Sequence, residues 1–202
     1  ETGVIMSIWR DINEQKQALL LADQMRITTF LKDVGIALTR GNSLQEILRH
    51  CADAIVSNLD AAFARIWTLN KEKAVLELQA SAGMYTHIDG PHGQIPVGKF
   101  KIGLIAREQR PILTNSVIDD VNISNKEWAE QEGMVAFAGY PLIIEGRLVG
   151  VMAMFARKIL PEFTLRALAA VADVIALGIV HKQDEEELRK SEKRFRTIFE
   201  NA

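Results

Sequence analysis

Four histidines and one cysteine are the side chains of this sequence best suited to bind a metal. His87 and His92 share a glycine- and proline-rich segment with Asp89, and this set could bind a transition metal, or one imidazole could bind a haem iron. Because loop histidines are more often solvated, we expect both to be exposed and keep them as weak metal candidates. His50 and Cys51 are adjacent on a predicted helix, where side chains point about 100° apart and chelate poorly.

A single cysteine excludes an intrachain disulfide and a zinc or iron–sulfur site built from cysteines. Cys51 falls on the apolar face of its helix, which predicts a buried and unreactive thiol. The sequence contains no phosphate loop ending in Lys-Ser/Thr, no Gly-x-Ser-x-Gly elbow and no His-Glu-x-x-His pair. We therefore assign no catalytic residue.

Large side chains alternate with small ones along residues 61–69. In a strand, Phe63, Arg65 and Trp67 would face one side of a sheet, and Ala62, Ala64 and Ile66 the other. Two aromatic rings with one cation suit a small-molecule cleft whose walls are mostly apolar.

The composition is that of an ordinary globular domain. The 202 residues are 48% hydrophobic and 25% charged, with a net charge of −2. These values argue against disorder and give no electrostatic signature of nucleic-acid binding. The longest apolar run, residues 165–180, contains Arg166 and Asp173, so we expect no membrane contact.

Apolar periodicity and turn signals predict an α+β fold with a six-stranded antiparallel sheet, helices packed on one face, and long terminal helices. Ser43 is the predicted N-cap of the second helix, with Glu46 in the capping-box position. The expected strands cover residues 3–10, 61–69, 73–80, 111–115, 136–144 and 147–157. The expected helices cover residues 12–40, 44–59, 100–109, 125–132 and 161–196, and residues 81–97 are predicted to form a loop.

The first long helix carries apolar residues at heptad spacing, which predicts a coiled-coil seam and a parallel homodimer through the terminal helices. The seam consists of Leu20, Ile27, Leu31, Val34 and Leu38.

The central part of the sequence resembles a GAF domain. The resemblance is strongest over residues 140–153, which read Tyr-Pro-Leu-Ile-Ile-Glu-Gly-Arg-Leu-Val-Gly-Val-Met-Ala and are followed by Phe163. Further similar stretches, in the same order, are residues 44–48, 64–69, 78–83, 98–106, 110–113 and 128–134.

Both ends of the sequence resemble parts of PAS domains. Residues 9–16, Trp-Arg-Asp-Ile-Asn-Glu-Gln-Lys, are similar to the close of a PAS domain, and residues 188–202 to the opening of another. The resemblance implies a PAS tail at 1–11, a linker and dimerisation helix at 12–40, a GAF domain at 41–181, and a signalling helix with a PAS start at 182–202.

This arrangement is typical of cytoplasmic modules in sensor histidine kinases, and less often of diguanylate cyclases. It implies a sensory or regulatory module that binds a small ligand or relays a signal, with the kinase outside this sequence. The alternatives are a ligand-free dimerisation spacer and an enzyme such as a free methionine sulfoxide reductase. A single cysteine weighs against the reductase, because that family uses several.

The resemblance also places a pocket on the sheet face opposite the helices. Its candidate lining residues are Arg65, Trp67, Asp119, Trp128, Tyr140 and Met152. The Asn-Lys-x-Phe-Asp-Glu set of cyclic-nucleotide binders is absent, and no cysteine lies where bilins attach. We expect no covalent bilin and no haem, and the cofactor is unknown.

Overall fold

The six strands form one antiparallel sheet in the order β3-β2-β1-β6-β5-β4. The computed structural model describes residues 2–121, 123 and 125–200. Its strands are β1 (Phe63–Asn70), β2 (Val75–Gly83), β3 (Gln94–Pro96), β4 (Ile112–Thr114), β5 (Ala136–Ile144) and β6 (Arg147–Ala156). Its helices are α1 (Thr2–Thr39), α2 (Leu44–Leu59), α3 (Phe100–Glu108), α4 (Lys126–Gln131) and α5 (Phe163–Glu200). The predicted α+β class and six-stranded sheet are confirmed.

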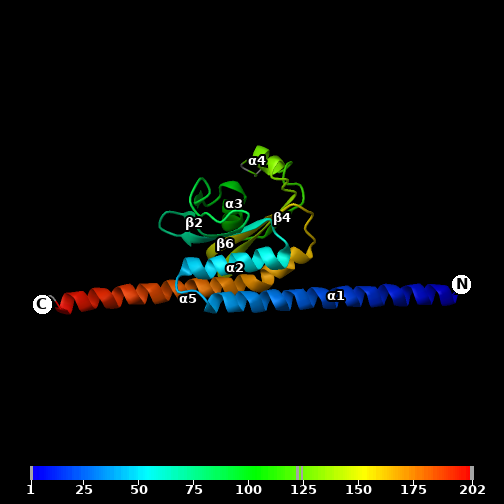
Figure 1. The fold of residues 1–202 in the computed structure, drawn as a ribbon, viewed down its shortest axis with the longest axis horizontal. Helices are drawn as coiled ribbons and strands as arrows, with labels where there is room; N and C mark the ends of the chain where they lie inside the picture. The colour runs from blue at the N-terminus through cyan, green and yellow to red at the C-terminus, as the bar shows by residue number, and fades with distance from the viewer. Residues whose placement is uncertain (1, 122, 124, 201–202) are drawn as a thin grey trace.

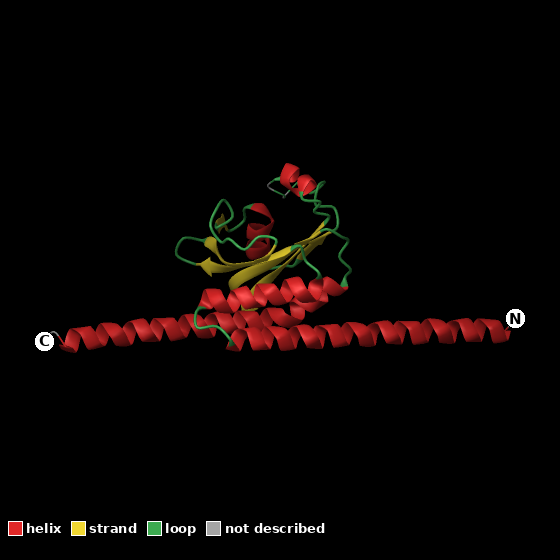
Figure 2. Ribbon diagram, in the orientation of Figure 1, coloured by secondary structure: helices red, strands yellow, loops and turns green. Residues whose placement is uncertain are grey.

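Helices cover the two faces of this sheet unequally. The long helices α1, α2 and α5 form a layer on one face, whereas the short α3 and α4 lie on the other (Figure 2). The layer side holds the larger core, in which Val34, Leu48, Ile55 and Ile175 are fully buried. A second apolar core lies on the α3 side.

Local signals explain the start of α2 and the turn between β5 and β6. Ser43 caps α2 by accepting a hydrogen bond from the backbone N–H of Glu46, and Glu46 accepts one from the N–H of Asn42. Glu145 and Gly146, both with positive φ, form the two-residue turn between β5 and β6, as such hairpins require.

The helices α1 and α5 run parallel to each other and extend beyond the domain in opposite directions, so the two termini lie far apart (Figure 1). Arg166 of α5 forms an ion pair with Asp23 of α1 at 2.9 Å. The Arg26 guanidinium lies 4.6 Å from the centroid of the Phe163 ring. Gly178 of α5 allows the two helices to pack closely at Leu38 of α1, because a Cβ at residue 178 would collide with the Leu38 side chain.

The predicted strand at 3–10 is wrong, because α1 is continuous from Thr2 to Thr39. Its alternation is short, and no glycine or proline interrupts residues 4–34, so the helix propagates through it. The sixth strand is instead β3. It lies inside the segment predicted as a loop and pairs with β2. Residues 1, 201 and 202 of the PAS-like ends lie outside the described residues.

Most of the heptad seam is used within the chain. Val34 is fully buried against the domain, and Ile27, Leu31 and Leu38 pack against the same core. Only Leu20 of the seam is an exposed large hydrophobic residue, at 48%. The seam from Ile27 to Leu38 therefore holds α1 on its own domain.

By length and composition, α5 is the one helix among the described residues that could cross a membrane. Half of its most apolar window is buried in the domain, as in the core helix of a globular protein. The first part of α5 belongs to the core, since Phe163, Leu168, Val171 and Ile175 are at most 5% exposed.

Candidate functional site

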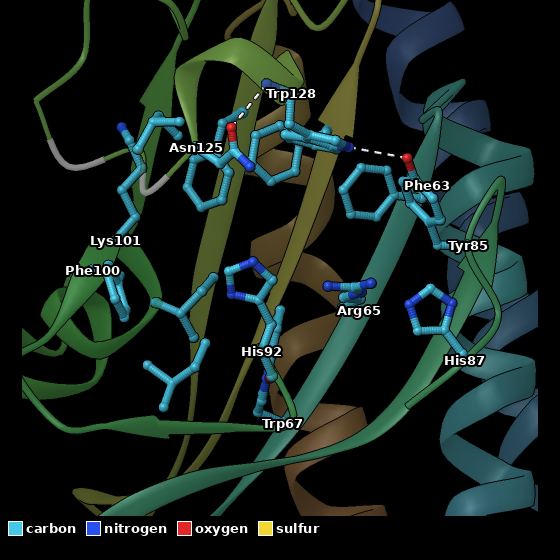
Figure 3. Close-up of a pocket in the computed structure, with 15 residues that line it drawn as sticks. Phe63, Arg65, Trp67, Tyr85, His87, His92, Phe100, Lys101, Asn125 and Trp128 are labelled. Atoms are coloured by element: carbon cyan, nitrogen blue, oxygen red, sulfur yellow. Dashed lines mark hydrogen bonds between the residues drawn. The ribbon is translucent and has the colours of Figure 1, made fainter. Parts of the chain in front are cut away.

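A pocket of about 310 Å³ lies on the sheet face that α1, α2 and α5 leave uncovered (Figure 3). Strands β1, β5 and β6 form its floor, and α3, α4 and the segment between β2 and β3 enclose it. The lining residues are Phe63, Arg65, Trp67, Tyr85, His87, His92, Ile95, Phe100, Lys101, Ile102, Ile123, Asn125, Trp128, Phe137 and Phe155.

Aromatic rings in mutual contact form one wall of the pocket. Phe63 stacks on Phe155 with centroids 5.1 Å apart, and the Trp128 ring meets both edge-on. The Trp128 Nε1–H donates to the Tyr85 hydroxyl at 3.0 Å, and this hydroxyl donates to Glu132 at 3.1 Å. These hydrogen bonds fix the wall in place, so the pocket is preformed.

Arg65 provides a positive charge at the centre of the site. Its Nε–H donates to the Ser81 hydroxyl at 3.2 Å, and Ser81 in turn donates to the carbonyl of Tyr85 at 2.7 Å. The guanidinium lies 5.4 Å from the Phe63 ring centroid, within cation–π range. Burial lowers the pKa of Arg65, and the nearby Tyr85 opposes this effect.

His92 lies beside Arg65 on the segment between β2 and β3 (Figure 3). Trp67 holds this segment over the sheet, because its Nε1–H donates to the His92 carbonyl at 3.0 Å. Burial lowers the pKa of His92, and the charge of Arg65 lowers it further. The imidazole is therefore neutral at pH 7, with one nitrogen able to donate and the other able to accept.

The pocket contains three of the six predicted lining residues: Arg65, Trp67 and Trp128. Tyr140 and Met152 do not line it: they lie opposite each other on β5 and β6, and both pack on the helix layer. On β6 the side chains facing the pocket core are Val151, Ala153 and Phe155, so alternation turns Met152 away. Asp119 lies in the loop after β4, where it accepts a hydrogen bond from Ser116, and it does not line the pocket either.

Several pocket residues are absent from the predicted set. Phe63 is on the face that alternation predicts, and Tyr85 and Phe155 complete the aromatic wall. His87 is exposed, as expected, and borders the pocket, whereas His92 is half-buried within it. Within the described residues, no group of three histidine, cysteine, aspartate or glutamate side chains is placed to hold a metal.

Lys101 is a buried cation of the pocket that already has a counterion. It is 4% exposed, and its ammonium group contacts the carboxylate of Asp120. The same group lies 5.1 Å from the centroid of the Phe137 ring. Its charge is therefore balanced within the protein.

Cys51 lies on α2, across the sheet from the pocket, and is fully buried. Burial raises the pKa of its thiol to about 12. At pH 8 the thiolate fraction is then about a thousandfold lower than for an exposed cysteine. We expect iodoacetamide to label the folded protein about a thousandfold more slowly than the urea-unfolded protein, as followed by mass spectrometry. Rapid stoichiometric labelling of the folded chain would contradict this placement.

The sheet order, the helix layer and a pocket on the opposite face are the features of a class of regulatory domains. A family model described as GAF domain matches residues 41–180. The chain belongs to the GAF domain family. A search of curated protein sequences finds no match.

Solved structures show the same fold at low sequence identity. The GAF domain of a phosphoenolpyruvate-protein phosphotransferase from Coxiella burnetii has a TM-score of 0.69 at 16% identity, covering 81% of this chain and 98% of that one. A free methionine-R-sulfoxide reductase from Neisseria meningitidis, solved with its substrate, has a TM-score of 0.66 at 13% identity, covering 79% and 91%. A fragment of a methyl-accepting chemotaxis protein has a TM-score of 0.59 at 18% identity, covering 74% and 96%.

Proposed function

We propose that this GAF domain is a sensory module of a multidomain signalling protein, of which a sensor histidine kinase is the favoured form. Its pocket receives a small molecule, and its terminal helices pass the change in state to an output domain outside this sequence. Membership of the GAF family supports a regulatory role, as does the fold shared with a chemotaxis-protein fragment and with the GAF domain of a phosphotransferase. The PAS-like character of both ends supports an array of cytoplasmic signalling domains.

The observation that carries this proposal is that the pocket and the helix layer share the same strands. On β1, Arg65 and Trp67 face the pocket, whereas Ala64 and Ile66 are fully buried against the helix layer. A ligand that shifts β1 must therefore also shift its packing against α2, which in turn contacts both α1 and α5. Closely packed interfaces of this kind transmit small displacements because they have discrete arrangements.

The terminal helices have the geometry needed for transmission. Their free ends point in opposite directions, so a signal could enter along α1 and leave along α5 (Figure 1). Large apolar side chains remain exposed on them, which supports a homodimer paired along these helices. They are Ile12, Leu19, Leu20, Leu21, Met25, Ile36, Leu177, Leu188 and Phe195.

A thermal-shift screen with a metabolite panel tests the sensory role. A ligand at a hundred times its Kd stabilises the folded state by about 2.7 kcal/mol, which raises the Tm of a domain of this size by roughly 5–10 °C. The shift should disappear in a Trp128→Leu variant, since Trp128 forms a wall of the pocket. Native mass spectrometry of the purified chain tests for a retained ligand.

A ligand-free spacer predicts a different result. No member of the panel would then raise the Tm, and native mass spectrometry would show only the mass of the chain. The alternative of a reductase has no support from the pocket, because Cys51 is the one cysteine of the sequence and lies across the sheet.

A further inference from the structure

Arg65 is a half-buried cation, and no carboxylate among the residues that the structure describes forms an ion pair with it. Among the residues whose side chains the structure describes, its hydrogen-bond partner is the neutral Ser81 hydroxyl, which uses the Nε–H. The terminal guanidinium nitrogens point toward the pocket (Figure 3). A partly desolvated charge without a counterion is unfavourable, and an anion in the pocket would relieve that cost.

The rest of the lining favours an anion over a cation. None of the fifteen described residues that line the pocket is acidic. Lys101 is balanced by Asp120, so Arg65 is the cation whose charge is available to a ligand. The neutral His92 beside it can add a hydrogen bond. A guanidinium fork pairs well with a planar carboxylate, which it can bind through two parallel hydrogen bonds.

The part of the pocket next to Arg65 is suited to a flat ring. Phe63, Trp128 and Phe155 present a continuous aromatic wall, with centroid separations of 5.1 to 5.8 Å. Aromatic walls of this kind favour stacked or edge-on contact with another ring. The volume of about 310 Å³ lies at the small end of ligand pockets and suits a compact molecule.

We infer that the pocket binds a small aromatic carboxylate, with its carboxylate on Arg65 and its ring against Phe63, Trp128 and Phe155. This inference rests on the sensory role proposed above and specifies the class of ligand for the same site. The ligand needs both its charge and its ring, because Arg65 binds the carboxylate and the aromatic wall binds the ring.

Calorimetric titration of the 202-residue chain with four matched probes separates these requirements. Benzoate carries both charge and ring, benzamide the ring alone, cyclohexanecarboxylate the charge with a non-aromatic ring, and acetate the charge alone. We expect benzoate to bind about 10- to 100-fold more tightly than benzamide, because charge-assisted hydrogen bonds are lost in the amide. Cyclohexanecarboxylate and acetate should also bind more weakly than benzoate. Phenylacetate and indole-3-acetate extend the series to longer acids.

An Arg65→Met variant identifies the residue responsible. It should bind benzoate at least tenfold more weakly than the unchanged protein while its affinity for benzamide stays the same. Its ligand-free Tm should stay close to that of the unchanged protein, because methionine removes a desolvated charge and retains the apolar stem. The matched control is Arg147→Met, an exposed arginine in the β5–β6 hairpin, which should leave all affinities unchanged.

Equal affinity for benzamide and benzoate, or unchanged benzoate binding by Arg65→Met, would overturn the inference. So would a neutral or cationic ligand from the metabolite panel whose thermal shift is lost in Trp128→Leu, although the sensory proposal would then stand. If no compound of any class binds in the pocket, both proposals fail.

Discussion

Replacing Val34 by aspartate should unfold the globular domain. Val34 lies on α1 and is fully buried in the core beneath the sheet. A carboxylate at this position would be buried without a partner, which costs upwards of about 4 kcal/mol. Domains of this kind have a total stability of roughly 5–15 kcal/mol, so most of it would be lost. Urea denaturation followed by circular dichroism measures the change.

A Leu20→Glu variant is the matched control from the same helix and the same heptad seam. Leu20 is 48% exposed, so the exchange should change the stability of the domain by no more than about 0.5 kcal/mol. Light scattering at tens of micromolar should show a dimer for the unchanged chain and a lower association for Leu20→Glu. A folded, stable Val34→Asp monomer would show that the seam pairs two chains and that α1 does not belong to its own core.

Sequence patterns were sufficient where a local signal fixed the structure. Ser43 and Glu46 mark the start of α2, and Glu145-Gly146 fixes the turn between β5 and β6. The strand β3 carries no such signal, because its three residues are held only by pairing with β2. Its Pro96 is tolerated because β3 is an edge strand.

The site was predictable only where one face of a strand differed from the other. On β1, alternation assigns Phe63, Arg65 and Trp67 to one face, and Ala64 and Ile66 to the other. On β5 and β6 both faces are covered, so residues such as Ala136, Phe137 and Ala138 are all buried. A strand buried on both faces reads as a continuous apolar run, and the side of Tyr140 and Met152 could not be inferred from it.

Tyr85 and His92 enter the pocket through long-range contacts. Tyr85 is held by Trp128, which is 43 residues away, and the His92 carbonyl by Trp67, which is 25 residues away. No periodicity within the loop specifies such contacts. The sequence shows the loop and its histidines but not their position over β1.

Insertions into α5 beyond the domain should change signalling according to their length. Ile179 is fully buried on the domain, whereas Leu188 is 63% exposed, so residues inserted after Glu187 lie outside the core. Each added helical residue rotates everything beyond it by about 100°. Two residues therefore leave the exit helix about 160° from its original phase, four leave it about 40° away, and seven bring it within about 20°.

If the helix relays a rotation or register shift in the parent protein, the seven-residue insertion should preserve control of the output. The two-residue insertion should abolish or invert it, and the four-residue insertion should impair it. Autophosphorylation of the full-length protein with and without ligand measures this, provided that the output domain is a kinase as proposed. The same insertions should leave the Tm of the 202-residue chain unchanged, because they do not touch the contacts of Phe163, Val171 and Ile175 with the core. If all three insertions behave alike in the output assay, phase does not matter and the charged end of α5 is a passive tether.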